Sequence, residues 1–142
     1  MDLFTKNEQW KADPRKLNFG IAFYGYEFDG VRAFGERYAK NGCKDMSYAE
    51  IETILASPAH GGWRLMRDSE VGGAPYLSRE DPDALISYDD AASTRNKVEV
   101  VIRDRHMGGI FAWRLGHDFN SVTGEQPLLD ALMNTYAKFA NK

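Results

Sequence analysis

The hydrophobic pattern of the chain contains two short runs that are almost continuously apolar. The first covers residues 17–26, with the end of the predicted strand at Tyr24-Gly25, and the second covers residues 109–113 and ends at Trp113. Runs of this length predict strands that are buried on both faces, as in parallel sheets covered by helices. Because two strands are too few for a sheet that is stable alone, the pattern indicates that further strands complete it.

Three segments carry the periodicity and the end signals of helices. Ser47 and Glu50 have the spacing of a capping box, an apolar face follows, and Pro58 ends the helix. A second helix is predicted from Ser93 to about Arg105. A third follows Pro127, which suits the first turn of a helix. The apolar stripe of the third helix consists of Leu128, Leu129, Leu132, Met133, Tyr136 and Phe139.

The middle of the chain, residues 27–92, has a different sequence pattern from the two ends. Strand-like pieces at 63–66, 74–77 and 85–88 are separated by glycine and proline, which predicts a small α+β module. Trp63 and Tyr76 either line the wall of a cleft or fill the core of this module. Residues 1–16 form a charged lead-in, in which Trp10 either packs on the body or is exposed.

Composition indicates one globular domain and argues against several functions. Of the 142 residues 43% are hydrophobic, enough for a core, and a net charge of −3 without a basic cluster makes nucleic acid an unexpected partner. No apolar run approaches the roughly 18 residues of a membrane helix, and residues 1–8 lack the apolar centre of a signal peptide. The single cysteine, Cys43, excludes an internal disulfide and is expected to be incidental. The histidines lack metal-ligand spacing, so no metal and no other cofactor is expected.

Three motifs, taken in order, resemble one known family. They are Leu17 to Tyr24 followed by Gly25, Leu85 to Ser93 with Lys97, and Gly108 to Trp113, with Ala74-Pro75-Tyr76 between them. Together they resemble the C-terminal part of a glycoside hydrolase family 18 chitinase, of the bacterial type with an α+β insertion. The resemblance covers about residues 15–135. It implies an α/β fold that is part of a (β/α)8 TIM barrel, with strands seven and eight and their helices in residues 1–26 and 89–142. Residues 27–88 would be the insertion, which forms one wall of the substrate cleft.

The same resemblance implies a substrate and a site. Family members hydrolyse β-1,4-linked N-acetylglucosamine polymers such as chitin, with retention and with the substrate's own acetamido group as nucleophile. Trp113 would be the platform on which a sugar stacks, although spacing alone favours a core role for it. Tyr24, Tyr26 and Tyr76 would bind substrate beside it. Localisation outside the cell follows from the substrate class alone.

The chain departs from the family pattern where catalysis is concerned. The signature Asp-x-x-Asp-x-Asp-x-Glu, which carries the catalytic acid, is absent, so no catalytic residue is assigned. Tyr26 stands where the family has a sugar-holding arginine, Arg114 where an acid is common, and Gly73 where a glutamate is common. The chain is therefore expected to be inactive alone. It would be either a segment or split subunit of a chitinase-like glycosidase, or a non-catalytic chitin-binding or oligosaccharide-binding module.

Other candidate sites and partners follow from the residues themselves. His117 and Asp118 invite a catalytic-triad hypothesis, but no nucleophile elbow is present, and a loop pair without catalytic role is the preferred interpretation. For Asp89 and Asp90 the family resemblance implies a structural role in front of a helix, with Ser93 as its cap. The unpaired edges of the two predicted strands indicate a partner, either the missing N-terminal part of the barrel or a second copy of the chain. We therefore expect the isolated chain to associate in a concentration-dependent way. A small α+β protein that uses its open side for a partner is a third hypothesis.

Overall fold

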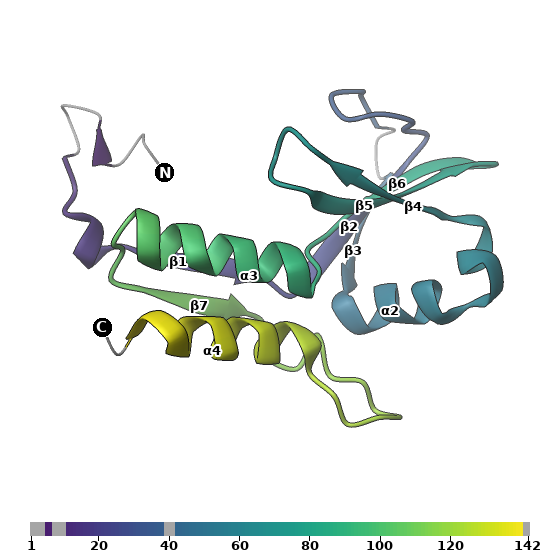
Figure 1. Cartoon of the computed structure of the whole chain (residues 1–142). Helices are drawn as coiled ribbons and strands as arrows, with labels where there is room; N and C mark the ends of the chain where they lie inside the picture. The colour runs from purple at the N-terminus through teal and green to yellow at the C-terminus, as the bar shows by residue number, and fades with distance from the viewer. Residues whose placement is uncertain (1–4, 7–10, 39–41, 141–142) are drawn as a thin grey trace.

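The computed structural model describes residues 5–6, 11–38 and 42–140, so Trp10 lies outside the described residues. The chain forms two sheets that lie side by side (Figure 1). A two-stranded sheet has the order β1-β7, and a five-stranded sheet has the order β3-β2-β6-β5-β4. The strands are β1 (Asn18–Ala22), β2 (Tyr24–Asp29), β3 (Cys43–Ser47), β4 (Arg64–Asp68), β5 (Ala74–Glu80), β6 (Asp83–Ser87) and β7 (Gly109–Trp113).

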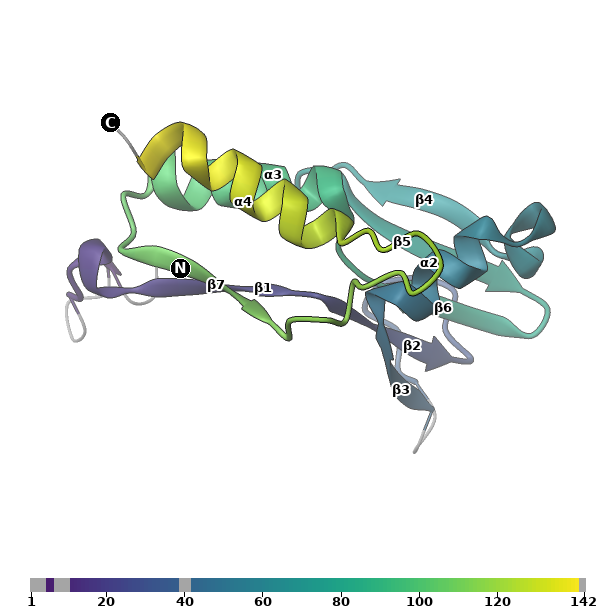
Figure 2. The ribbon, with the colours of Figure 1, turned by 90° about the horizontal axis from the view of Figure 1, so that it is seen from below.

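The two-stranded sheet confirms that both apolar runs form strands. β1 and β7 are parallel, and Ile21 pairs with Ala112 in the register. Helices α3 (Ala91–Glu99), which continues as a π-helical turn at Val100–Asp104, and α4 (Pro127–Ala140) cover one face of this sheet (Figure 2). Ile21 and Phe23 are fully buried against them. The predicted helix after Pro127 is thereby confirmed.

The prediction that both strands are buried on both faces is wrong for this chain. Phe111 is 50% exposed and Trp113 is 63% exposed, both on β7. Alternate side chains of a strand point to opposite faces, and only the face towards α3 and α4 has a cover (Figure 2). Met133, expected in the apolar stripe of α4, is likewise 55% exposed, because that side of α4 has no neighbour among the described residues.

The first apolar run divides at Phe23 into strands of different sheets. The backbone N–H of Phe23 donates to the carbonyl of Trp113 at 2.8 Å, and the carbonyl of Phe23 accepts from the N–H of Tyr48 at 3.1 Å. β1 therefore ends at Ala22 and β2 begins at Tyr24, rather than one strand running to Tyr24-Gly25. The boundary placed between residues 26 and 27 falls inside β2, and the division into barrel and insertion segments stays a prediction.

The five-stranded antiparallel sheet is the predicted α+β module. It contains the three expected strand pieces and also β3, which the pattern did not indicate. Helix α2 (Tyr48–Ala56) covers one face, where Met46, Ile51 and Ile86 are buried. Its capping box is confirmed, because the Ser47 hydroxyl accepts from the N–H of Glu50 and the Glu50 carboxylate accepts from the N–H of Ser47. Short 3-10 helices lie at Pro14–Lys16 and Pro58–Gly62.

Helix α3 begins earlier than predicted. Asp90 is the N-cap, and its carboxylate accepts from the N–H of Ser93 at 2.8 Å. Ser93, expected as the cap, is instead the third residue of the helix, and its hydroxyl accepts from the N–H of Asp90. Asp89 is buried and pairs with Lys97 at 2.5 Å. The structural role expected for Asp89 and Asp90 is therefore confirmed.

Candidate functional site

A pocket lies where β7 ends beside the five-stranded sheet. Its volume is about 290 Å³, and it brings together three of the four residues predicted to bind sugar. The lining residues are Tyr24, Tyr26, Asp45, Trp113, Arg114 and His117. The pocket therefore joins the end of the two-stranded sheet to the β2–β3 edge of the larger one, with an indole, two phenols and charged groups around one space.

Trp113 forms the apolar part of the pocket. It is the last residue of β7, and 63% of its surface is exposed. The alternative interpretation of Trp113 as a core aromatic is therefore wrong for this chain. An exposed indole at the end of a strand provides a flat apolar platform, the kind of surface on which a sugar ring stacks. The peptide bond between Trp113 and Arg114 is cis.

Tyr24 and Tyr26 project from the same face of β2, because they are two residues apart on one strand. Their rings meet edge to face, with centroids 5.5 Å apart. The neighbouring Tyr24, burial and the Asp45 carboxylate raise the pKa of Tyr26 above its ordinary value. The Tyr26 hydroxyl therefore keeps its proton at neutral pH and can donate a hydrogen bond to a ligand.

Arg114 is held at the rim of the pocket by His117. The Nε atom of Arg114 donates to Nε2 of His117 at 2.5 Å, which requires the neutral form of the imidazole. The Nδ1 atom of His117 is buried without a hydrogen-bond partner in the described part of the chain. Asp45 makes no ion pair with Arg114 in the described structure, so the guanidinium fork and the carboxylate remain available to a ligand.

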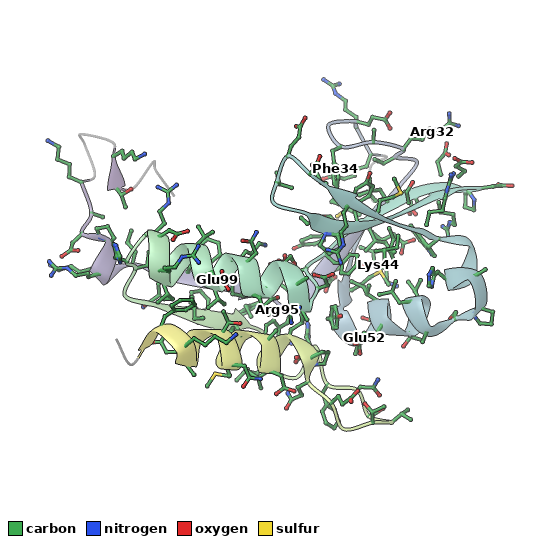
Figure 3. The ribbon with its side chains drawn as sticks, in the orientation of Figure 1. Arg32, Phe34, Lys44, Glu52, Arg95 and Glu99 are labelled. Atoms are coloured by element: carbon green, nitrogen blue, oxygen red, sulfur yellow. The ribbon has the colours of Figure 1, made fainter. Side chains whose placement is uncertain are left out.

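Tyr76 lies outside the pocket but on the sheet face that continues from it. The cross-strand row that includes Tyr26 and Tyr76 runs directly over all five strands, and it consists of Asp45, Tyr26, Ser87, Tyr76 and Met66. Residues directly opposite in a sheet share a face. Phe34 packs on Tyr76 with ring centroids 4.9 Å apart (Figure 3). The row therefore extends from the pocket to an aromatic pair.

Several other candidate residues have structural roles. Asp118 is fully buried, and its Oδ2 atom accepts from the N–H groups of Leu128 and Leu129 at the start of α4. The triad hypothesis is therefore wrong, and the interpretation as a loop pair without catalytic role is supported. Trp63 belongs to the core, with the Arg79 guanidinium 4.4 Å from its ring centroid. Cys43 is exposed on β3 rather than in a loop.

A larger groove of about 740 Å³ lies between α2 and the segment 119–123. It contains none of the predicted sugar-binding residues, and its lining includes Tyr48, Leu55 and Phe119. In the described part of the chain, no three His, Cys, Asp or Glu side chains converge as metal ligands. No described helix combines the length and the apolarity needed to cross a membrane.

The chemistry available in the pocket is that of binding. Trp113 offers a stacking surface, Tyr26 and Arg114 offer donors, and Asp45 offers an acceptor. Asp45 is the one carboxylate that lines this pocket in the described structure, whereas glycoside hydrolysis commonly needs two acidic groups about the bond that is cleaved. Sequence reasoning missed Asp45 because the polar composition of β3 gave no strand signal.

Comparison with known proteins identifies relatives of this chain. The family model described as glycosyl hydrolases family 18 matches residues 2–118. Chitinase B of Serratia marcescens is 28% identical over 129 residues, which cover 72% of this chain and 25% of that protein. Probable chitinase 10 of Drosophila melanogaster is 28% identical over 133 residues, which cover 85% of this chain and 6% of that protein.

Solved structures support the same relationship. Catalytic domain 2 of the Group II chitinase of Ostrinia furnacalis is 26% identical, with a TM-score of 0.71, and the match covers 92% of this chain and 37% of that one. The Group IV chitinase of the same organism, solved with allosamidin, is 25% identical, with a TM-score of 0.73 and the same coverage of both chains. The chain thus spans little more than a third of the length of these structures.

The expected fold is confirmed by these matches. The parallel strands β1 and β7 with α3 and α4 are a portion of the (β/α)8 barrel of these chitinases, and an α+β module lies between the strands in sequence. The pocket at the end of β7 lies at the carboxyl end of a barrel strand, the end at which active sites of this fold are built. The chain belongs to glycoside hydrolase family 18.

Proposed function

We propose that the chain is the C-terminal, substrate-contacting segment of a chitinase-like glycosidase that acts on β-1,4-linked N-acetylglucosamine polymers. Trp113 stacks on a sugar ring, and Tyr24 and Tyr26 donate hydrogen bonds around it. The observation that carries this proposal is the exposed indole of Trp113, which shares one pocket of about 290 Å³ with both tyrosines.

Two relatives support the class of ligand. Catalytic domain 2 of the Ostrinia furnacalis Group II chitinase was solved in complex with penta-N-acetylchitooctaose, (NAG)5. The Group IV chitinase of the same organism was solved in complex with allosamidin. The counterpart of this chain forms 37% of each of those structures. We therefore propose chitooligosaccharides as ligands, and an extracellular place of action, since chitin is an external polymer.

The cross-strand row supports a ligand of several sugar units. Strands lie about 4.8 Å apart, so the backbones of Tyr26 and Tyr76, two strands apart, are separated by about 10 Å. Tyr76 with Phe34 then contacts a sugar unit beyond the one that stacks on Trp113. Ser87 lies between the two tyrosines and offers a hydroxyl to the intervening part of the ligand.

Hydrolysis needs a group that this sequence does not contain. The mechanism proposed for the complete site is retaining and substrate-assisted, in which a glutamic acid protonates the leaving oxygen. The 142 residues lack the Asp-x-x-Asp-x-Asp-x-Glu signature, so the acid comes from a separate segment of the barrel. The chain supplies the platform, the donors and one wall, and it does not cleave alone.

Titration with chitopentaose, followed by tryptophan fluorescence and calorimetry, tests the binding role. Saturable binding that Trp113→Ala abolishes is expected. Phe119→Ala removes an aromatic side chain that is 47% exposed but outside this pocket, and it should leave the affinity unchanged. Equal affinity of the Trp113→Ala variant and the unchanged chain would contradict the proposal, as would turnover of chitopentaose by the chain alone.

A non-catalytic chitin-binding module is the second candidate. It is favoured by the fact that Tyr24, Tyr26 and Trp113 already share a pocket within this chain. Both candidate functions predict sugar binding. They are distinguished by measuring hydrolysis after a barrel segment that contains the catalytic signature has been added to the chain. Turnover by the mixture indicates a split or segmental enzyme, and binding without turnover indicates the module.

A further inference from the structure

The groove of about 740 Å³ between α2 and residues 119–123 shares no lining residue with the Trp113 pocket. Its volume lies within the range of small-ligand sites, about 300–1,000 Å³. One wall is a helix, and the other is a loop held by its own hydrogen bonds. The Asn120 side chain accepts from the N–H of Val122 at 3.0 Å and from that of Thr123 at 3.2 Å. The groove is therefore preformed, which lowers the ordering cost of binding.

The groove carries a negative charge that no described cation balances. Glu52 lines it, whereas no lysine, arginine or histidine does so among the described residues. Glu52 lies beside the start of α2, on the side of the loop that precedes α4 (Figure 3). Burial, Glu125 and Asp118 raise the pKa of Glu52, although a hydrogen bond with Asn120 lowers it. Asp118 is fully buried and keeps Oδ1 without a partner in the described structure. A positively charged ligand would therefore be favoured here.

The hydroxyl groups of the groove offer acceptors instead of donors. The hydroxyls of Thr53 and Ser57, one turn apart on α2, donate to helix carbonyls at 3.0 Å and 2.8 Å. The Thr123 hydroxyl donates to the Glu125 carboxylate at 3.0 Å. A hydroxyl has one proton and two lone pairs, so these three groups can only accept from a ligand while their bonds are kept. Together with Glu52 they suit a ligand that is rich in N–H and O–H donors.

An exposed aromatic ring completes the groove. Phe119 is 47% exposed and lines the wall opposite α2. Its flat face can pack on the C–H side of a sugar ring, and the face of an aromatic ring also attracts a cation. An amino sugar with a free amine combines the three properties that the groove matches: a positive charge, several hydroxyl donors and an apolar ring face.

We propose that this groove binds a β-1,4-linked glucosamine oligomer, the cationic, deacetylated form of the polymer proposed for the Trp113 pocket. The ammonium group pairs with Glu52, ring hydroxyls donate to Thr53 and Thr123, and the sugar ring packs on Phe119. The choice of a sugar as the body of the ligand rests on the proposed function, whereas the groove itself calls for the positive charge and the donors. Acetylation removes the charge and leaves one N–H donor, so chitooligosaccharides fit this groove less well.

Calorimetric titration with tetraglucosamine near neutral pH and at low salt tests the proposal. It is done in the Trp113→Ala variant, which lacks the platform of the other pocket, and saturable binding is expected. Adding Glu52→Gln should weaken binding by about tenfold or more, through loss of a charge-assisted hydrogen bond. Adding Phe119→Ala should weaken it about fivefold. Glu70→Gln removes the same charge at an exposed residue outside the groove and should leave the affinity unchanged.

Two further ligands separate charge from sugar recognition. Chitotetraose, which is neutral and of equal length, should bind this variant at least about tenfold more weakly than tetraglucosamine. Spermidine carries ammonium groups without a sugar ring, and its binding should be weaker and insensitive to Phe119→Ala. Spermidine binding as tight as that of tetraglucosamine would overturn the sugar assignment.

The absence of saturable tetraglucosamine binding would overturn the proposal, as would an unchanged affinity after Glu52→Gln. The test of the Trp113 pocket uses a different sugar and a different variant. Glu52→Gln in the otherwise unchanged chain should leave chitopentaose binding intact, because Glu52 does not line that pocket. Failure at the groove and failure at the Trp113 pocket are therefore distinguishable.

Discussion

The Oδ2 atom of Asp118 accepts the backbone N–H of Leu129 at 2.8 Å and thereby caps α4 from eleven residues upstream. The same atom accepts from Leu128 at 3.1 Å. Both donors belong to the first turn of the helix, where N–H groups lack partners within the helix. A negative charge also interacts favourably with this end of a helix. Asp118 thus fixes the loop that follows Trp113 to the start of α4.

Asp118→Ala should lower the free energy of unfolding by about 2 kcal/mol, because the N–H groups of Leu128, which is buried, and Leu129, which is partly buried, lose their acceptor. Denaturant unfolding measures this loss. Glu125→Ala, in the same loop but exposed, is the matched control and should change stability by less than about 0.5 kcal/mol. An Asp118→Ala variant as stable as the control would show that the cap contributes nothing.

Gly25→Ala should destabilise the chain by about 2–3 kcal/mol through overpacking. A Cβ atom there would lie 2.6 Å from the carbonyl oxygen of Ser87 and 2.8 Å from Cδ1 of Ile51, both in packed surroundings. Gly20→Ala is the informative comparison, because its Cβ would meet only the ring of Phe111, which is half exposed and can move. In thermal unfolding, the melting temperature of Gly25→Ala should be well below that of Gly20→Ala. The reverse order would contradict the packing around Gly25.

The stability should depend on pH through Asp90. Burial raises the pKa of this carboxyl, but the N–H of Ser93 and the Arg67 guanidinium lower it more, so that its pKa lies below the ordinary value. A lowered folded-state pKa stabilises the fold above the unfolded value of about 3.9, and this contribution is lost as pH falls through the folded value. Asp90→Asn should therefore cost up to about 1 kcal/mol at pH 7.

The difference between the unchanged chain and Asp90→Asn should shrink towards zero as pH falls below about 3.9. Denaturant unfolding at a series of pH values measures it. Asp104→Asn is the control: the pKa of that carboxyl is also lowered, first by the hydrogen bond from Arg103, but both groups are exposed, so solvent screens the pair and the substitution should change stability little at any pH. A difference between the Asp90→Asn variant and the unchanged chain that stays constant down to pH 2 would exclude a role for the charge.

Tyr76→Ala should affect long ligands more than short ones. The row places Tyr76 two strands beyond Tyr26, so at the proposed site we expect chitopentaose to reach Tyr76 and chitobiose bound at Trp113 not to reach it. We expect the affinity for chitopentaose to fall about fivefold, near 1 kcal/mol, with chitobiose unaffected. Tyr24→Ala should weaken both. Calorimetry with the two sugars measures these affinities. If Tyr76→Ala lowered the affinity for both sugars equally, a separate contact at Tyr76 would be excluded.

Local signals in the sequence predicted the elements that local interactions determine. The Ser47–Glu50 capping box is formed by residues three apart, so its spacing alone indicates the start of α2. The division of the first apolar run at Phe23 was not predictable in this way. It depends on a hydrogen bond to Trp113, which is ninety residues away in sequence. A continuous run of apolar residues carries no mark of such a change of sheet.

The candidate site was likewise only partly predictable from the sequence. Trp113 and Tyr24 were identified because they end apolar runs and belong to family motifs, but no periodicity indicated β3, in which only Met46 is buried. Asp45 consequently entered the site only through the pairing of β3 with β2. The exposure of Phe111 could not be predicted from the sequence either, because Phe111 belongs to an apolar run with the pattern of a buried strand, yet half of its surface is exposed in the structure.

The backbone N–H and C=O groups of Phe23 link the two sheets through hydrogen bonds. The Trp113 carbonyl accepts from Phe23, and the Phe23 carbonyl accepts from Tyr48, so one line of hydrogen bonds runs from the end of β7 into the first turn of α2. The indole of Trp113 and the phenols of β2 are thus carried by a single rigid frame. For the proposed sugar site, we therefore expect the spacing that these hydrogen bonds set between Trp113 and β2 to contribute to discrimination among ligands.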